Sequence, residues 1–379
     1  MSGPARIVVF GATGYTGTLV ARALVERGAR PVLAGRSRDK LARLADALGG
    51  LETHIADVAH PASIRAAIGH GDVLISTVGP FLQWGNAAVE AAIDAGANYL
   101  DSTGEPAFIR KVFEHYGPQA RLRSSALMTA YGFDWVPGNL AATLALTRAG
   151  TAATRVEIAY LLNGTSAESG GAEASAAAAI IAPSFAFRQG RLVTERTAAR
   201  ARRVADASGK SRWILSAGGT EHLTLPEQFP HLRDIEVGLG LYGASSAVVP
   251  YVSAVLNAGM RIPAVAGGIR RAMARKANGS SGGPSDEARA AGSTSVIARA
   301  WSDKDELLQT TILTGVDGFS FTANFLAWAS IQAAGGIIGT GALGPVQAFG
   351  VDALEEGVRQ SGITRADRRS DQSLIASAI

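Results

Sequence analysis

The sequence predicts an α/β fold whose N-terminal part is a doubly wound parallel sheet. Over residues 1–150, six short apolar runs typical of buried strands alternate with segments of helical periodicity. The first run ends in a glycine-rich turn that opens a helix, as the first strand of such sheets commonly does. At 379 residues the chain is too long for one ordinary core, so we expect a second domain.

The composition indicates a folded chain and excludes several kinds of site. Hydrophobic residues make up 47% and charged residues 18% of the sequence, which favours a packed core over disorder. The absence of cysteine excludes disulfides, thiolate nucleophiles and zinc–thiolate sites, and we predict no metal site. Met1 is followed almost at once by the first strand, without the regions of a signal peptide, so we expect a cytoplasmic protein.

The net charge of +4 raises the question of a nucleic-acid partner, because basic chains attract phosphate non-specifically. The cations are spread along the chain, and their modest clusters lack the interleaved aromatic residues on which bases would stack. We therefore interpret them as solvated surface and predict no nucleic-acid partner.

The glycine-rich turn lies in the segment Ile7–Gly17, IVVFGATGYTG. Gly11 permits the turn, Gly14 lets the backbone approach a pyrophosphate, and Gly17 lets the helix pack on the strand. The helix N-terminus then offers unpaired N–H groups to phosphate. The spacing is GxxGxxG and not GxGxxG, so a plain glycine-rich turn is the alternative. We predict a dinucleotide site formed by Gly11, Thr13, Gly14, Tyr15, Thr16 and Gly17.

The next strand, Pro31–Ala34, indicates which dinucleotide is bound. A carboxylate at its end would hydrogen-bond the ribose 2′-OH of NAD, but GRSR follows instead. Arg36, Arg38 and Lys40 suit the 2′-phosphate of NADP, with Arg36 as the main contact. The alternative is that these cations are exposed charges at the start of a helix. We predict NADP.

Two later strands add residues to the predicted cofactor site. Asp57 follows the strand Thr53–Ala56, where such folds often contact the adenine amino group, although it could equally cap a helix. The strand Asp72–Val78 leads into Gly79-Pro80 at the carboxyl edge of the sheet, where ligands bind. We expect Thr77, Gly79 and Pro80 to lie against the cofactor.

Four side chains at the same edge are candidate catalytic residues. Asp101 and Glu105 end and follow the strand Asn98–Ser102, and Tyr131 and Asp134 follow the strand Ser125–Ala130. Carboxylates at this edge can orient a substrate or relay a proton. The alternative is that they are loop and helix-terminus carboxylates favoured by the helix dipole.

The segments GATGYTG, AGRSRDKL, ISTVGPF, YLDSTGEPAF and YGFDWVPGNL together resemble the saccharopine dehydrogenase-like oxidoreductases, and within them the branch of trans-acting enoyl reductases. The resemblance is close over the first 150 residues and loose beyond. It implies a Rossmann-type NADP-binding domain (1–150), an inserted α+β substrate or dimerisation domain (151–317) and C-terminal helices (318–379) that return to the first domain. The branch commonly has serine where Trp135 stands, so we expect a differently shaped pocket beside Asp134.

The resemblance also implies an NADPH-dependent oxidoreductase that reduces a polarised C=C bond of an enoyl or polyketide-type substrate. Such a reduction needs a donor to the enolate oxygen and an acid for the α carbon, for which Tyr131 is our candidate. The alternatives are an imine or amino-acid reductase of the saccharopine type and a non-catalytic NADP-binding protein.

Beyond residue 150, we expect strands at Arg155–Leu161, Asp234–Tyr242, Thr294–Trp301 and Glu306–Leu313, a helix from Gly170 up to Pro183, and a mobile loop at Lys276–Gly292.

Two long stretches of the second half, Val237–Met260 and Gly318–Val351, contain no charged residue. We interpret them as buried helices that line a pocket for a lipid-like substrate or form a homodimer interface. Peripheral membrane contact is the weaker alternative.

Overall fold

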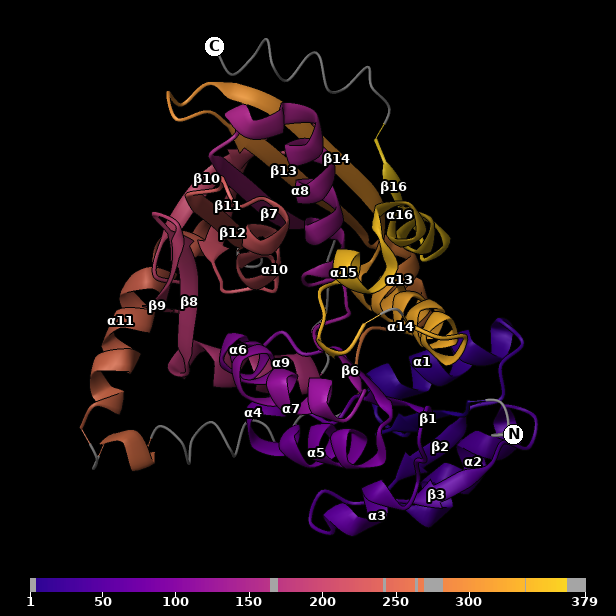
Figure 1. Cartoon of the computed structure of the whole chain (residues 1–379). Coiled ribbons are helices and arrows are strands. Elements are labelled where there is room, and N and C mark those ends of the chain that lie inside the picture. Colours follow the sequence, from indigo (N-terminus) through magenta and orange to yellow (C-terminus); the bar gives the residue numbers. More distant parts are fainter. Residues whose placement is uncertain are drawn as a thin grey trace.

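The computed structural model describes residues 5–163, 170–240, 243–262, 265–268, 282–337 and 339–366. Two sheets lie one above the other with helices between and around them (Figure 1). The first sheet contains the strands β1 (Ile7–Phe10), β2 (Val32–Gly35), β3 (Thr53–Ile55), β4 (Val73–Ser76), β5 (Asn98–Asp101), β6 (Ala126–Met128) and β15 (Gly341–Ala342).

The described strands of the first sheet are all parallel, in the order β15-β6-β5-β4-β1-β2-β3. The order reverses between β1 and β4, which creates the crevice where doubly wound sheets bind ligands. The predicted fold class is therefore confirmed. The edge strand β15 was not predicted. It comes from the C-terminal part of the chain, and Gly341 pairs with Ala126.

The helices that follow the strands of this sheet cover both of its faces. Pro106 opens α6 as predicted, because its missing N–H costs nothing in the first helical turn. A single π-helical turn, Val112–Tyr116, separates α6 from α7. The helices are α1 (Tyr15–Glu26), α2 (Arg38–Ala47), α3 (Pro61–Arg65), α4 (Phe81–Trp84), α5 (Asn86–Ala95), α6 (Pro106–Lys111) and α7 (Gly117–Leu122).

The second sheet is mixed and is built from the middle of the chain. It contains β7 (Arg155–Asn163), β8 (Pro183–Arg188), β9 (Arg191–Arg196), β10 (Ala201–Ala205), β11 (Ser211–Ser216), β12 (Asp234–Gly240), β13 (Ser293–Trp301), β14 (Leu307–Val316) and β16 (Ile363–Arg365). Its main path is β10-β11-β12-β7-β13-β14-β16, with β8 and β9 paired beside β12. Only β7 and β12 are parallel to each other among these described pairs.

The helix α8 (Val136–Ala149) packs against β7, β13 and β14 of the second sheet. From the sequence we expected this helix to pack on the first sheet, because it follows the last of the six strands that alternate with helices over residues 1–150. The loop from β6 to α8 therefore crosses from one layer to the other and carries Asp134 between them. The remaining helices are α9 (Gly170–Ile181), α10 (Glu221–Gln228), α11 (Val249–Met260), α13 (Asp286–Ala291), α14 (Gly318–Ala334), α15 (Pro345–Phe349) and α16 (Val351–Gln360).

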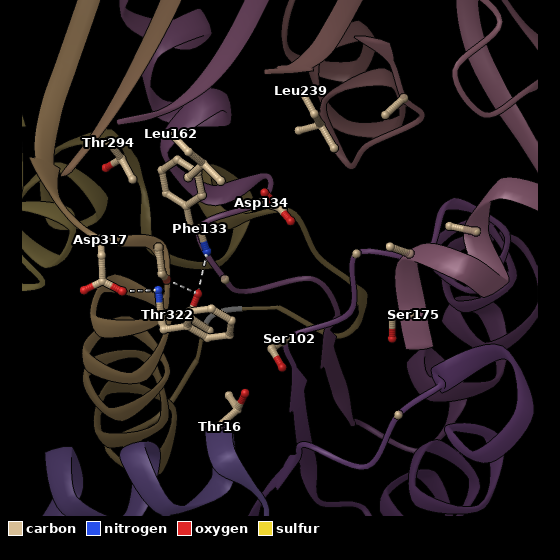
Figure 2. Close-up of a pocket in the computed structure, with 18 of the residues that line it drawn as sticks. Thr16, Ser102, Phe133, Asp134, Leu162, Ser175, Leu239, Thr294, Asp317 and Thr322 are labelled. Atoms are coloured by element: carbon tan, nitrogen blue, oxygen red, sulfur yellow. Dashed lines mark hydrogen bonds between the residues drawn. The ribbon is translucent and has the colours of Figure 1, made fainter. Parts of the chain in front are cut away.

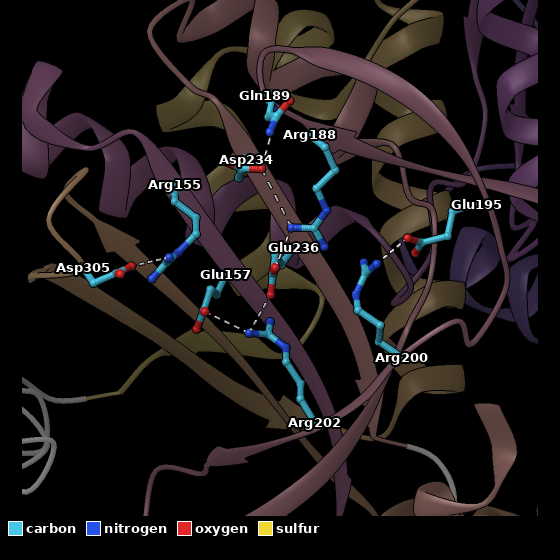
Figure 3. Close-up of polar contacts among 10 residues, drawn as sticks. All are labelled: Arg155, Glu157, Arg188, Gln189, Glu195, Arg200, Arg202, Asp234, Glu236 and Asp305. Carbon is cyan, nitrogen blue, oxygen red and sulfur yellow. Dashed lines mark hydrogen bonds and ion pairs between the residues drawn. The ribbon is translucent and has the colours of Figure 1, made fainter. Parts of the chain in front are cut away.

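One face of the second sheet carries an ion-pair network (Figure 3). Arg202 lies 2.9 Å from both Glu157 and Glu236, and Arg188 lies 2.5 Å from Glu236. Arg188 and Glu236 lie on the paired strands β8 and β12, where opposite charges stabilise a sheet. Arg202 reaches from β10 past β11 to Glu236 of β12 and Glu157 of β7. The network shows why these strands carry charges within an otherwise apolar pattern.

Several predictions for the second half need correction. The predicted loop Lys276–Gly292 contains the helix α13, which Ser285 caps by accepting a hydrogen bond from the Ala288 N–H. Residues 276–281 of that loop, and residues 241–242 of the predicted strand Asp234–Tyr242, lie outside the described residues. The strands β8 to β11 and the helix α10 were not predicted.

The helices in the two uncharged stretches differ in how deeply they are buried. In Gly318–Val351, α14 is buried and packs against α1, with Phe321 and Phe325 fully enclosed. In Val237–Met260, α11 is largely exposed, so this helix is not buried within the chain, and its role in a homodimer interface stays a prediction. No helix within the described ranges has both the length and the apolar character needed to cross a bilayer.

Candidate functional site

A cavity of about 310 Å³ lies between the carboxyl edge of the first sheet and the second sheet (Figure 2). The first domain supplies Thr16, Thr77 and Gly79, and the second supplies mostly apolar side chains, with α14 along one side. The lining includes Thr16, Thr77, Gly79, Phe81, Ser102, Gly104, Phe133, Asp134, Leu162, Ser175, Ile180, Thr197, Leu239, Val249, Arg289, Asp317, Phe319 and Thr322.

The glycine turn has the geometry of a phosphate site. Gly11 adopts a φ of +87°, and a Cβ there would lie 2.7 Å from Thr77 Oγ1. A Cβ at Gly17 would clash with the Gly11 carbonyl, so this glycine lets α1 pack on the turn. Gly14 is exposed and caps α1, whose first helical bond runs from Thr18 N to Gly14 O. The N–H groups of residues 15–17 have no backbone partner in the described chain and are free for phosphate.

Three cations lie at and after the end of β2, where we predict contact with the 2′-phosphate. Arg36, Arg38 and Lys40 are exposed and form no ion pair with the described part of the chain. The Thr13 hydroxyl lies 3.9 Å from the Cβ position of Gly35, so the glycine turn and the end of β2 are adjacent. These positions fit the 2′-phosphate prediction, because an unpaired arginine can bind phosphate without first losing a partner.

Other predicted cofactor residues divide between the cavity and its surroundings. Thr77 and Gly79 line the cavity, and the Thr77 hydroxyl bonds the carbonyls of Phe10 and Gly11 at 3.2 Å. Pro80 caps α4 and is not among the lining residues. Asp57 accepts a 3.0 Å bond from the Ala59 N–H, and the N-cap of α3 is His60, so Asp57 does not cap that helix.

Asp101 and Glu105 are fully buried and lie outside the cavity lining. Asp101 accepts hydrogen bonds from the N–H groups of Thr103 and Ala130 and from the Thr129 hydroxyl, at 2.7–2.9 Å. Burial raises its pKa to about 6, although these bonds act in the opposite direction. Asp101 thus links the ends of β5 and β6 through hydrogen bonds. This geometry fits the alternative that it is a structural carboxylate in a loop and not a catalytic one.

Glu105 holds the start of α4. Its Oε1 accepts bonds from the Phe81 N–H and the Ser175 hydroxyl, both at 2.7 Å, and its Oε2 accepts one from the Leu82 N–H at 2.9 Å. Burial raises its pKa. Because both oxygens are occupied, Glu105 positions the loop after β4 and the helix α9 and does not face a ligand.

Tyr131 does not face the cavity, which corrects the expectation that it lies on the ligand edge. Its hydroxyl donates a 3.1 Å bond to the Leu343 carbonyl, and its ring packs beside Phe325 and Phe349. Complete burial raises its pKa well above the usual value. A phenol held in this way cannot reach a substrate in the cavity.

Asp134 is the one of the four candidate catalytic residues that lines the cavity, and Figure 2 shows its carboxyl pointing into the space between the two layers. A Cβ at Gly104 would lie 3.5 Å from its Oδ2. Burial raises the pKa of Asp134 to about 6, and no hydrogen bond from the described part of the chain offsets this. The preceding peptide is fixed, because the Phe133 N–H donates to Thr322 Oγ1 at 2.9 Å.

Trp135 lies beneath this loop and is fully buried against Tyr160, with ring centroids 5.7 Å apart. Its φ of +106° turns the chain from Asp134 into α8. Since Trp135 is absent from the cavity lining, any influence on pocket shape passes through the position of the Asp134 loop.

Arg289 is a lining residue that the sequence analysis missed. It lies on α13, and its Nη1 donates to the Tyr15 hydroxyl at 2.9 Å while Nη2 pairs with Asp286 at 2.7 Å. Among the described lining residues it is the only cation. No sequence signal connects it with the glycine motif, because the two are 274 positions apart and meet only in the folded chain.

The fold and the cavity define a dinucleotide-binding protein in which a second domain covers the cofactor edge of a Rossmann-type sheet. Residues 7–129 match the family described as the saccharopine dehydrogenase NADP binding domain. Over these residues the chain is therefore similar to NADP-binding domains of the saccharopine dehydrogenase type, and the match confirms the predicted cofactor, NADP(H).

Two further comparisons agree with this assignment. Trans-acting enoyl reductases from Mycobacterium ulcerans and Mycobacterium leprae are each 37% identical to this chain over 140 residues. The match covers 35% of this chain and 34% of each enzyme, so it spans about a third of the length of these curated relatives. Saccharopine dehydrogenase (L-Glu forming) from Saccharomyces cerevisiae has the same overall fold, with a TM-score of 0.60 at 13% identity over 96% of this chain and 99% of that one.

We expect Arg36→Asp to weaken NADPH binding by about tenfold or more and to leave NADH binding nearly unchanged, because a repelling charge replaces the cation facing the 2′-phosphate. Fluorescence titration with both cofactors measures this preference. Arg43→Asp makes the same charge change on an exposed position of α2 and should leave the preference intact. Equal affinity of the wild type for NADPH and NADH would refute the assignment of Arg36.

Proposed function

We propose that this protein is an NADPH-dependent reductase of a polarised C=C bond in an apolar, acyl-type substrate. The observation that carries the proposal is the cavity itself, where one unpartnered carboxyl group, Asp134, faces an apolar chamber beside the cofactor edge. The similarity of the first domain to trans-acting enoyl reductases supports the same reaction.

We propose that NADPH binds through the unpaired N–H groups and the cations at the edge of the first sheet. The N–H groups of residues 15–17 would hold the pyrophosphate, and Arg36 with its neighbours would hold the 2′-phosphate. The nicotinamide end would then lie along Thr77 and Gly79, toward the cavity. Bound NADPH supplies the hydride for the β carbon, and the protein supplies orientation and the proton.

We assign the proton donor to Asp134 in place of Tyr131. With a pKa of about 6, the Asp134 carboxyl is partly protonated near neutral pH and can transfer its proton to the α carbon. The Ser102 hydroxyl lines the same cavity and is our candidate donor to the enolate oxygen. Phe133 and Thr322 fix the loop, so the acid is held in position before the substrate binds.

The cavity argues against an amino-acid substrate of the saccharopine type. Such a substrate carries several carboxylates, and each would need a cation or a set of donors when it leaves water. Arg289, the only cation among the described lining residues, is already engaged by Asp286 and Tyr15. Much of the remaining lining is apolar and includes Leu239 of β12 and Ile180 of α9.

We expect kcat/KM to rise with the acyl chain length of an enoyl thioester series until the cavity is filled. Each buried CH₂ contributes about 0.8 kcal/mol, which corresponds to about fourfold in kcat/KM. NADPH oxidation measured over the series tests this expectation, with cyclic imines and keto acids as comparison substrates. A series without any length dependence would argue against an acyl substrate, and the absence of turnover with every substrate would favour a non-catalytic NADP-binding protein.

A further inference from the structure

The helix α11 has two polar side chains on its inner side and several exposed apolar side chains on its outer side. Ser253 Oγ donates a 2.6 Å bond to the Thr197 carbonyl, and Asn257 Nδ2 donates a 3.0 Å bond to the Ile180 carbonyl. On the opposite side, Tyr251 is 73% and Val255 is 72% exposed. A helix on the surface of a water-soluble domain normally has the reverse orientation.

The exposed apolar face extends beyond the helix. Val248 precedes α11 and is 58% exposed, and Ile262 follows it and is 54% exposed. Val248, Tyr251, Val252 and Val255 have the i, i+3, i+4, i+7 spacing of one helical stripe. Figure 1 shows α11 at the margin of the molecule, with β8 and β9 on its inner side. A contiguous apolar stripe marks a surface that contacts another apolar phase or partner.

In the sequence on either side of this stripe, the charged residues have one sign. From Val237 to Ser285 the sequence contains no acidic residue, while it contains five cations, Arg261, Arg270, Arg271, Arg275 and Lys276. Of these, Arg261 directly follows α11 and is exposed. An apolar helical face in a basic part of the sequence suits a lipid surface with anionic headgroups. The apolar side chains would contact the acyl chains, and the cations would contact the headgroups. A two-fold contact with a second copy would instead bring like charges together.

The same helix forms part of the cavity wall. Val249 at its start lines the cavity, and Thr197 and Ile180, which accept the two inward hydrogen bonds, are lining residues as well. The exposed stripe and the apolar chamber therefore lie on opposite sides of one helix.

We propose that α11 is an interfacial helix that places its Tyr251–Val255 face in an anionic lipid surface. Because α11 also lines the cavity, this contact would hold the cavity beside the lipid bilayer, in which apolar acyl substrates dissolve. This last step rests on the proposed function, whereas the lipid contact itself does not.

The test is sedimentation of the full chain with vesicles of phosphatidylcholine alone and of phosphatidylcholine with phosphatidylglycerol. We expect the wild type to bind the anionic vesicles and to dissociate as salt is raised. The double variant Val252→Glu/Val255→Glu should lose about tenfold or more of this binding, because two charges must enter the interface. Leu122→Glu is the matched control, since Leu122 is 87% exposed on α7 and lies outside the stripe.

The outcomes separate this proposal from the proposed reductase activity. NADPH binding should be the same in the double variant and the wild type, since none of the changed residues lies at the glycine turn. The lipid contact is overturned if the wild type does not sediment with anionic vesicles. It is also overturned if the double variant binds them as strongly as the wild type does. Light scattering that shows a wild-type dimer and a monomeric double variant overturns it in favour of a second copy. A loss of NADPH oxidation alone leaves the vesicle result standing.

Discussion

Asp134→Asn is expected to lower kcat for NADPH oxidation by about 10²- to 10⁴-fold, the contribution that a positioned general acid makes. The amide has the size of the carboxyl but no proton to transfer. Binding of NADPH should remain unchanged, because Asp134 lies across the cavity from the glycine turn. Steady-state kinetics with an enoyl thioester, combined with a cofactor titration, measures both quantities.

The pH dependence gives a second readout of the same residue. Burial raises the pKa of Asp134 to about 6, so the protonated form that donates is populated below pH 6 and is lost as the pH rises. The wild-type rate in the reductive direction should therefore fall above pH 6, and the Asp134→Asn variant should lose this dependence. Asp134→Glu, which keeps an acid at a shifted position, should restore part of the rate together with the pH profile.

The Asp134→Asn substitution should also change the stability of the folded state. Since the folded pKa is raised, the native state holds the proton more tightly than the unfolded chain between the ordinary pKa and about 6. Asp134 therefore lowers the free energy of unfolding as the pH rises through this window. Asp134→Asn removes the penalty, so a thermal melt at pH 7 should show an equal or higher Tm. An active Asn variant with an unchanged pH profile would show that the proton comes from elsewhere.

The first domain could be predicted from the sequence because its signals are local. Several strands are short, buried and mostly apolar runs, such as Ile7–Phe10 and Val73–Ser76. The glycine motif indicates the turn between strand and helix within eleven residues. The cofactor class follows from the charge at the end of one strand. These features depend on residues that are neighbours in the chain, and sequence patterns report such neighbours well.

The second domain and the catalytic residues depend on contacts between distant segments. The strands β9 and β10 carry several charges that are neutralised only across the sheet, as Arg202 is by Glu157 and Glu236, so their pattern does not look like that of strands. A strand-end carboxylate looks the same in sequence whether it faces a ligand, as Asp134 does, or binds the backbone, as Asp101 does. Which of these occurs is decided by loop geometry that periodicity does not report.

The uncharged stretch that contains α11 illustrates the same limit. Ser253 and Asn257 look like interruptions of an apolar helix, and they reveal their inward direction only when their carbonyl partners are placed. In α14 an equally uncharged stretch is buried, because α1 packs against it. Composition predicted apolar surface in both helices, and tertiary packing alone determined which one is enclosed.

Gly14→Val is expected to abolish NADPH binding while the chain remains folded. Gly14 is exposed at the N-cap of α1, so a branched side chain there would occupy the space that the pyrophosphate needs beside the N–H groups of residues 15–17. Inside the protein, a Cβ at this position would meet only the Gly11 carbonyl, at 3.2 Å, which a small shift can relieve. Isothermal titration with NADPH and a thermal melt measure the two effects separately.

Gly17→Val provides the contrasting variant, because it lies in the same motif and differs only in where its side chain would point. Its Cβ would collide with the backbone of Gly11 and Ala12, so α1 could no longer pack on the turn. We expect this variant to unfold at a clearly lower temperature, whereas Gly14→Val should melt near the wild type. If Gly14→Val binds NADPH as the wild type does, the pyrophosphate does not lie on this turn, and the assignment of the glycine motif fails. The contrast works because a side chain at Gly14 would have room toward solvent, whereas one at Gly17 would meet the packed backbone of the turn. Gly14 is therefore expected to matter for the ligand and Gly17 for the fold.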